Sequence, residues 1–263
     1  MAGKIAGRLA VASLSLGFLS APGLRAEDTP QLSAQCQAPA ADIAAPAPLP
    51  NLAATLASHK KIRILAIGSS STYGIGASSR SRNYPAQLHE ILAKSLNGVD
   101  VEIVNRGVSG EVAATTAERL RSEVAIERPD LVLWQLGTND ALSRVSPEQF
   151  EETVRSTVDW LKADKIDVVL VGLQYTPKLA RDDNYKAIRD VLLKIASDEN
   201  ILYIRRYEAM QFISKARATP TMMSADDFHL NDLGYRCMAE HIAQAVIANV
   251  FVRRFRPPTN YTP

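Results

Sequence analysis

Apolar residues in this chain form short continuous runs that alternate with longer amphipathic stretches. Five runs rich in Val, Ile and Leu have the length of strands: residues 62–67, 101–105, 131–136, 168–172 and 201–204. Such runs are typical of parallel strands buried on both faces. Apolar residues at helical spacing predict helices over residues 83–96, 147–163, 184–199 and about 232–250. This alternation predicts an α/β fold, a three-layer α/β/α sandwich built on a parallel sheet of about five strands.

Small and polar residues fill the loops that follow the first three predicted strands. These loops are residues 68–72 (Gly-Ser-Ser-Ser-Thr), 106–111 and 137–140 (Gly-Thr-Asn-Asp), and a fourth polar loop, residues 226–229, precedes the last helix. In a doubly wound sheet, the loops that follow strands converge on one edge, where such folds bind ligands. Side chains from distant parts of the sequence are therefore expected to meet there.

A serine in the first loop can act as a nucleophile only if a base removes its proton. The chain has four histidines, at positions 59, 89, 229 and 241. His59 lies beside two lysines and is expected to be solvated, whereas His89 and His241 fall in predicted helices. His229 lies in the fourth loop, three residues after Asp226, which can orient the imidazole ring as the third member of a triad does. A helix-capping or merely exposed role for His229 stays open.

Acyl transfer also needs donors for a developing oxyanion. Gly110 can present its backbone N–H at close approach, Asn139 can offer its side-chain amide, and the N–H of Ser70 is a third donor. Each of these loops, taken alone, is equally typical of ordinary turns. Their combination and order point to an acyl-transfer site.

These loops resemble the four sequence blocks of the SGNH (GDSL-type) hydrolases, over roughly residues 62–247. The family's signature serine, glycine, asparagine and histidine match Ser70, Gly110, Asn139 and His229, and the acid of the fourth block matches Asp226. The resemblance implies a flavodoxin-like sandwich with Ser70 as nucleophile and His229 as general base and acid, oriented by Asp226. It implies an oxyanion hole of Ser70, Gly110 and Asn139, and neither a metal nor an organic cofactor.

Two positions of the first block depart from the family pattern. Ser69 replaces the aspartate and Ser71 replaces the leucine, so three serines are adjacent and the choice of Ser70 depends on aligning Gly68 with the family's glycine. In the fourth block Asp227 competes with Asp226 as the acid. The family spacing of Asp-x-x-His favours Asp226.

The sequence predicts four segments along the chain. Residues 1–26 have a basic start and a short apolar stretch, which predicts a secretory signal peptide and export to the periplasm or medium; an uncleaved anchor is the alternative. Residues 27–58 hold five prolines and predict a Pro/Ala-rich linker or arm. Residues 59–250 form the SGNH hydrolase domain, and residues 251–263 a basic tail.

Composition narrows the classes of partner. Hydrophobic residues make up 46% of the chain, enough for a sizeable core. Removing Lys4, Arg8 and Arg25 with the signal leaves 27 basic residues against 28 acidic ones, so no nucleic-acid partner is expected. No later segment is apolar for long enough to span a bilayer, so the mature chain should lack an integral membrane segment. The oligomeric state is not indicated.

The two cysteines, Cys36 and Cys237, allow two readings. An exported compartment permits a disulfide between them, which would tie the N-terminal arm to the last helix. Two unpaired thiols, with Cys237 in the core, are equally compatible with the sequence.

The sequence thus predicts an exported serine hydrolase that cleaves carboxylic esters through an acyl-enzyme on Ser70. The resemblance implies a small-molecule or glycan ester as substrate: a short acyl or O-acetyl ester, or a lysophospholipid. Alternatives are an O-acyltransferase or deacetylase of cell-envelope polysaccharide, a non-catalytic binding module, and a flavodoxin-like cofactor binder. Four aromatic residues are candidates either for the substrate site or for ordinary core and surface positions: Tyr73, Tyr84, Trp134 and Tyr175.

Overall fold

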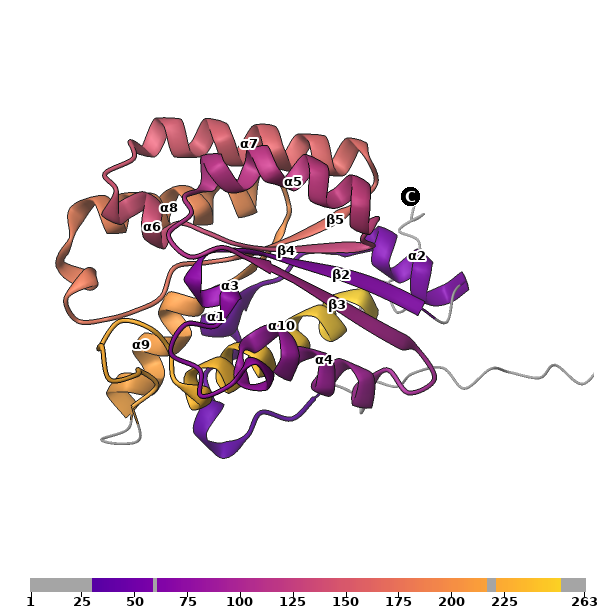
Figure 1. Cartoon of the computed structure of the whole chain (residues 1–263), viewed down its shortest axis with the longest axis horizontal. Coiled ribbons are helices and arrows are strands. Elements are labelled where there is room, and N and C mark those ends of the chain that lie inside the picture. The colour runs from indigo at the N-terminus through magenta and orange to yellow at the C-terminus, as the bar shows by residue number, and fades with distance from the viewer. Residues whose placement is uncertain (1–29, 59–60, 217–220, 252–263) are drawn as a thin grey trace, which may run out of the picture.

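A twisted six-stranded sheet divides the molecule into two helical layers (Figure 1). The computed structural model describes residues 30–58, 61–216 and 221–251. The strands are β1 (Ala44–Ala45), β2 (Lys61–Gly68), β3 (Asp100–Gly107), β4 (Leu131–Gln135), β5 (Asp167–Val171) and β6 (Leu202–Ile204). Their order is β1-β6-β5-β4-β2-β3, and only β1 is antiparallel to its neighbour. The predicted α/β sandwich is confirmed; the five predicted strands are β2 to β6, and β1 adds a sixth.

Successive residues of each strand enter different cores, because side chains alternate between the two faces of a sheet. In β2, Ile64 and Ala66 join one buried cluster, and Leu65 and Ile67 join the other. The first cluster lies under α4 (Tyr84–Ser95), α10 (Asp232–Phe251) and α2 (Pro50–Ser58). The second lies under α5 (Ala113–Glu127), α7 (Pro147–Ala163) and α8 (Asp183–Asp198), the upper layer in Figure 1.

The four helices predicted by spacing are α4, α7, α8 and α10, each within two residues of its expected ends. Several short or weakly periodic helices were not predicted individually: α1 (Ala40–Ile43), α3 (Ser70–Tyr73), α5, α6 (Thr138–Leu142) and α9 (Arg206–Ala216). Helix α5 buries only one residue per turn, at Ala113, Thr116, Leu120 and Val124. Such a narrow apolar stripe gives a weak periodic signal.

The segment expected to be a linker or arm is packed against the domain from residue 30 onward. It supplies β1, α1 and α2, and its residues Ile43, Leu49 and Leu52 are buried. The backbone N–H of Leu52 donates to Asp167 on β5 at 2.9 Å. Prolines interrupt the segment, but Ile43, Ala47 and Leu49, which lie between them, are buried. The predicted signal peptide and almost all of the basic tail lie outside the described residues.

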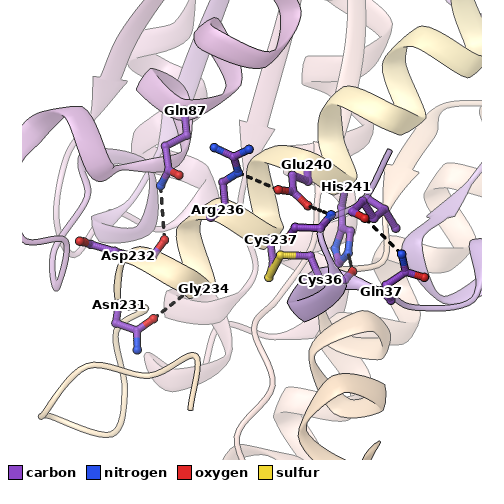
Figure 2. The surroundings of a disulfide bond; sticks show 12 residues. Cys36, Gln37, Gln87, Asn231, Asp232, Gly234, Arg236, Cys237, Glu240 and His241 are labelled. Atoms are coloured by element: carbon purple, nitrogen blue, oxygen red, sulfur yellow. Dashed lines mark hydrogen bonds and ion pairs between the residues drawn. A yellow bond between two sulfur atoms is a disulfide. The ribbon is translucent and has the colours of Figure 1, made fainter. Parts of the chain in front are cut away.

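A disulfide between Cys36 and Cys237 fastens this segment to α10 (Figure 2). Around it, Ser33 N donates to Glu240 at 2.8 Å, and His241 Nε2 lies 2.7 Å from the carbonyl oxygen of Cys36. Of the two readings that the sequence allows, the structure contains the disulfide. The bridge joins positions 201 residues apart.

The strand order also fixes where the loops meet. Strand β2 lies between β3 on one side and β4 on the other, so the chain reverses its direction across the sheet after β3. This reversal places a crevice outside the carboxyl end of β2, between the loops that follow β3 and β4. Within the described ranges, no helix has the length and apolar character needed to cross a membrane.

Candidate active site

The serine turn begins at the carboxyl end of β2. Gly68 has a φ of +151°, and a Cβ atom there would lie 2.4 Å from the carbonyl oxygen of Gln135, so only glycine fits. The next residues, Ser69 to Thr72, are all buried. Gln135, the last residue of β4, holds the turn: its Oε1 accepts from Ser69 N at 3.0 Å and from Ser69 Oγ at 3.1 Å.

The histidine loop lies between α9 and α10. A β-bridge between Met223 and Leu230 closes it, and Ser224 N donates to His229 O at 2.8 Å. Inside the loop, Asp226 Oδ1 accepts from Ser224 Oγ and from the backbone N–H groups of Phe228 and His229, at 2.7 to 3.0 Å. This network aims the other carboxylate oxygen at the imidazole.

Three expected residues form a continuous chain of contacts. Asp226 Oδ2 lies 2.5 Å from His229 Nδ1, and His229 Nε2 lies 3.2 Å from Ser70 Oγ. Hydrogen bonds from His229, and then from Ser224, hold the pKa of the Asp226 carboxyl well below its usual range. An ionised Asp226 favours the tautomer that carries its proton on Nδ1, which leaves the Nε2 lone pair directed at the serine. The hydrogen bond and ion pair to the imidazole come from Asp226 and not from Asp227, whose φ of +54° places it in the turn.

The expected oxyanion donors lie on loops that are joined to the serine turn. Val108 N donates to Gly68 O at 2.9 Å, and Asn139 Nδ2 donates to Glu111 O at 2.8 Å, which ties the second loop to both its neighbours. Gly110 is exposed, has a φ of +85° and would have no atom within 4 Å of an added Cβ. Among the described residues, nothing accepts a hydrogen bond from the N–H of Ser70 or of Gly110.

Salt bridges and a buried carboxylate brace these loops. Arg119 donates from Nε to Glu111 Oε1 at 3.0 Å and from Nη2 to Glu111 Oε2 at 2.7 Å. Asp140 accepts from Ala113 N at 2.7 Å and from Gly137 N at 3.1 Å. Burial raises the pKa of the Asp140 carboxyl, and its backbone hydrogen bonds oppose that rise.

The other candidate residues are spread over the molecule. His89 is exposed on α4, and His241 is buried against Cys36; His59 lies outside the described residues. Trp134 and Tyr84 are fully buried core residues. Tyr73, three residues after Ser70, is 53% exposed at the mouth of the site.

Buried polar residues around the site were missed at the sequence level: Gln135, Gln174 and Arg206. Gln135 and Gln174 are each 1–2% exposed, and each ends or follows an apolar strand run. A polar residue at the end of a buried strand run is unusual, because a buried polar group needs a hydrogen-bond partner. This feature could have marked both glutamines. Arg206 has no comparable signal, because arginine is common at the start of surface helices.

Two hollows adjoin the loops of the site. A cavity of about 780 Å³ lies beside the histidine loop, walled by Asp226, Phe228 and mostly apolar side chains, among them Leu142, Tyr175, Leu179, Met210, Ile213 and Met222. The Phe228 ring meets the His229 ring edge-on, with 4.9 Å between centroids. An open groove of about 1200 Å³ runs from Tyr73 and Gly107 along β3 and α4. Among the described side chains, no group of three or more His, Cys, Asp or Glu residues is placed to hold a metal ion.

Comparison with known proteins gives one family and several relatives. Residues 35–251 match the family described as a non-GDSL lipase-like family. The chain is 28% identical to esterase TesA of Pseudomonas aeruginosa over 166 residues, which cover 63% of this chain and 78% of the relative. It is 25% identical to an arylesterase of Vibrio mimicus over 195 residues, covering 74% and 92%. The crystal structure of a two-domain esterase (CEX) active on acetylated mannans shares the fold, with a TM-score of 0.69 and 20% identity over 86% of this chain and 61% of that one.

Proposed function

The chain belongs to the non-GDSL lipase-like family, within the SGNH (GDSL-type) hydrolases, and on that premise we propose that it cleaves esters through an acyl-enzyme on Ser70. Membership makes it a carboxylic ester hydrolase. The observation that carries the serine mechanism is the continuous contact from Asp226 through His229 to Ser70. The first block of this chain reads Gly-Ser-Ser-Ser instead of Gly-Asp-Ser-Leu, which agrees with the description of the matched family as non-GDSL.

The proposed reaction begins when His229 Nε2 removes the proton of Ser70 Oγ and the oxygen attacks the ester carbonyl. The N–H groups of Ser70 and Gly110 and the Asn139 amide stabilise the oxyanion. The imidazolium, paired with Asp226, then protonates the leaving alcohol. Water, activated by the same imidazole, releases the acid and restores the serine.

The cavity beside the histidine loop favours an acyl or alcohol group larger than acetate or methanol. Its walls are mainly apolar, and they include Phe228, which lies against the His229 ring. A hydrocarbon chain placed there would remove apolar surface from water, at about 25 cal/mol per Å². We therefore propose esters with a short to medium hydrocarbon chain as the preferred substrates.

The first experiment treats residues 27–263 with a fluorophosphonate probe, for the wild type and for Ser70→Ala. Addition of one probe mass to the wild type alone is the expected result. A panel of p-nitrophenyl esters from two to twelve acyl carbons then measures kcat/KM, which should rise beyond acetate. A folded wild-type chain that neither takes up the probe nor hydrolyses any ester would instead favour the binding module.

A second candidate is the deacetylation of a glycan, or acyl transfer to one. The observation that favours it is the open groove that starts at exposed Tyr73 and continues along β3. Acetate release from an acetylated polysaccharide, compared with transfer to an added glycan acceptor, separates hydrolase from transferase. A kcat/KM for acetylated glycan above that for every simple ester would favour this candidate.

Export is a proposal that rests on the signal-like sequence of residues 1–26. Fractionation of producing cells and the intact mass of the purified chain test it. A mature N-terminus near residue 27, recovered outside the cytoplasm, is expected.

A further inference from the structure

Arg206 is a buried cation close to the proposed nucleophile. It is the first residue of α9, and its side chain is 3% exposed. Within the described parts of the chain, no carboxylate pairs with its guanidinium, and its Nε and Nη1 atoms have no hydrogen-bond partner. Burial lowers the pKa of this guanidinium from its ordinary value, but an arginine in a protein remains charged.

A single atom, Nη2, makes both of its hydrogen bonds. It donates to Ser71 Oγ at 3.1 Å and to Gln174 Oε1 at 3.0 Å. Ser71 follows the proposed nucleophile directly. On the other side, Gln174 Nε2 donates to the carbonyl oxygen of Phe228 at 2.9 Å, and Phe228 precedes His229.

The same network reaches the loop of the proposed oxyanion donor Asn139. Tyr185 donates to the carbonyl oxygen of Gln174 at 2.7 Å, and its hydroxyl lies 3.2 Å from Thr138 Oγ1. Thr138 precedes Asn139. A buried set of polar groups thus joins the residues next to Ser70, Asn139 and His229.

The cost of burying Arg206 argues against a purely structural role. A buried charge without a counter-charge destabilises a fold, and an apolar side chain of similar size is often equally or more stable there. The position is occupied by arginine nonetheless, and its Nη2 atom reaches both the serine turn and the loop after β5. Ser71, which stands where the GDSL pattern has leucine, supplies one of the two hydrogen-bond acceptors of Arg206.

We propose that Arg206 is a positioning residue for ester hydrolysis, which holds the nucleophile turn and the histidine loop in register through Ser71 and Gln174. The inference rests on the proposed function of Ser70 and His229. It extends the site to a residue that contacts neither substrate nor reacting atoms.

The test compares Arg206→Met, Arg206→Lys and Ser71→Ala with the wild type. Arg206→Met should lower kcat by about 10- to 100-fold with little change in KM, because small displacements of reacting groups cost rates of this size. Its thermal unfolding midpoint should stay equal to the wild type or rise. Arg206→Lys keeps the charge on a shorter side chain that does not reach as far as Nη2, and should recover part of the lost kcat.

Arg205→Met is the matched control, because Arg205 points to the arm, where it donates to Ala41 O at 2.9 Å. It should keep the wild-type kcat. Combining Ser71→Ala with Arg206→Met should cost no more in kcat than Arg206→Met alone, since both remove the same link. If Arg206→Met does not fold, Arg206→Lys and Ser71→Ala carry the test, each with a lowered kcat at unchanged KM.

Two results would overturn the proposal: a folded Arg206→Met with kcat within twofold of the wild type, or losses in the double variant that simply multiply. Both are measured against a wild type that hydrolyses ester and takes up the fluorophosphonate probe on Ser70. An inactive, unlabelled wild type would instead reject the proposed function itself.

Discussion

His229 Nε2 lies 3.2 Å from Ser70 Oγ, although 159 residues separate the two in the chain. The serine is presented by the turn after β2, and the histidine by a loop closed by its own β-bridge. Neither loop can place its side chain alone. The contact therefore depends on the packing of both loops against the same edge of the sheet.

Ser70→Ala should lower kcat/KM for an ester substrate by about 10⁴- to 10⁶-fold, since members of a triad act as a unit. The variants at the adjacent serines serve as controls: Ser69→Ala loses the hydrogen bond that Ser69 Oγ donates to Gln135, and Ser71→Ala loses the one that Ser71 Oγ accepts from Arg206. Each of these should cost no more than about 100-fold. Steady-state kinetics on the three purified variants decides the register, which is wrong if Ser69→Ala or Ser71→Ala is the most damaging.

Asp226→Asn should lower kcat by about 10⁴-fold, because an amide cannot hold the imidazole in the productive tautomer as the carboxylate does. Asp227→Asn should stay within about threefold of the wild type, since the hydrogen bond and ion pair of His229 are with Asp226 and asparagine tolerates the positive φ of position 227. Circular dichroism of both variants checks the fold. Equal losses in the two variants would reject Asp226 as the only acid.

Asn139→Ala should reduce kcat by about 10²- to 10³-fold with KM nearly unchanged, as expected for a donor that acts on the transition state. Asn249→Ala is the matched control, because Asn249 is half-buried at the far end of α10 and its side-chain amide donates to Ala245 O on the same helix. A loss in Asn139→Ala confined to KM would place the amide in ground-state binding instead.

Reduction of the Cys36–Cys237 disulfide should lower the free energy of unfolding by about 2–5 kcal/mol, because the bridge constrains a long segment of the unfolded chain. Urea unfolding with and without reductant measures this difference. The double variant Cys36→Ser/Cys237→Ser should have the free energy of unfolding of the reduced wild type, and added reductant should not change it. Ester hydrolysis at low temperature should persist, since the bridge lies on α10 and not among Ser70, Asp226 and His229.

His241 should make the protein less stable in mild acid. Burial lowers the pKa of its imidazole, so the folded state keeps the ring neutral while the unfolded chain takes up a proton near pH 6.5. The free energy of unfolding therefore falls as the pH drops below 6.5, and this loss levels off below the lowered folded value.

His241→Gln should reduce the decline of the unfolding midpoint between pH 7 and pH 5, because glutamine does not titrate and can still donate to Cys36 O. His89→Gln, at an exposed position on α4, should leave the decline as in the wild type. An unchanged pH dependence in His241→Gln would assign the acid sensitivity to other groups.

The sequence alone determined the repeating pattern of strand and helix, the three polar loops that follow strands and the fourth polar loop before the last helix. The strands β2, β4, β5 and β6 are mostly apolar, and β3 has apolar residues at Val101, Ile103 and Val104, so their signal is local and survives without knowledge of the fold. The order of the loops then located Ser70, Gly110, Asn139, Asp226 and His229 as a set. Strand β1, with two alanines, carries no periodicity, and its place at the sheet edge depends on β6 as partner.

Only the tertiary structure decided which polar groups meet. Whether Cys36 and Cys237 pair, which of Asp226 and Asp227 faces the imidazole, and which aromatic residues are core all depend on distances between loops and helices that sequence spacing does not record. The same is true of Gln135, Gln174 and Arg206, whose partners lie 32 to 135 residues away. Periodicity is a property of neighbouring residues, whereas a buried hydrogen bond forms only where packing brings a donor and an acceptor together.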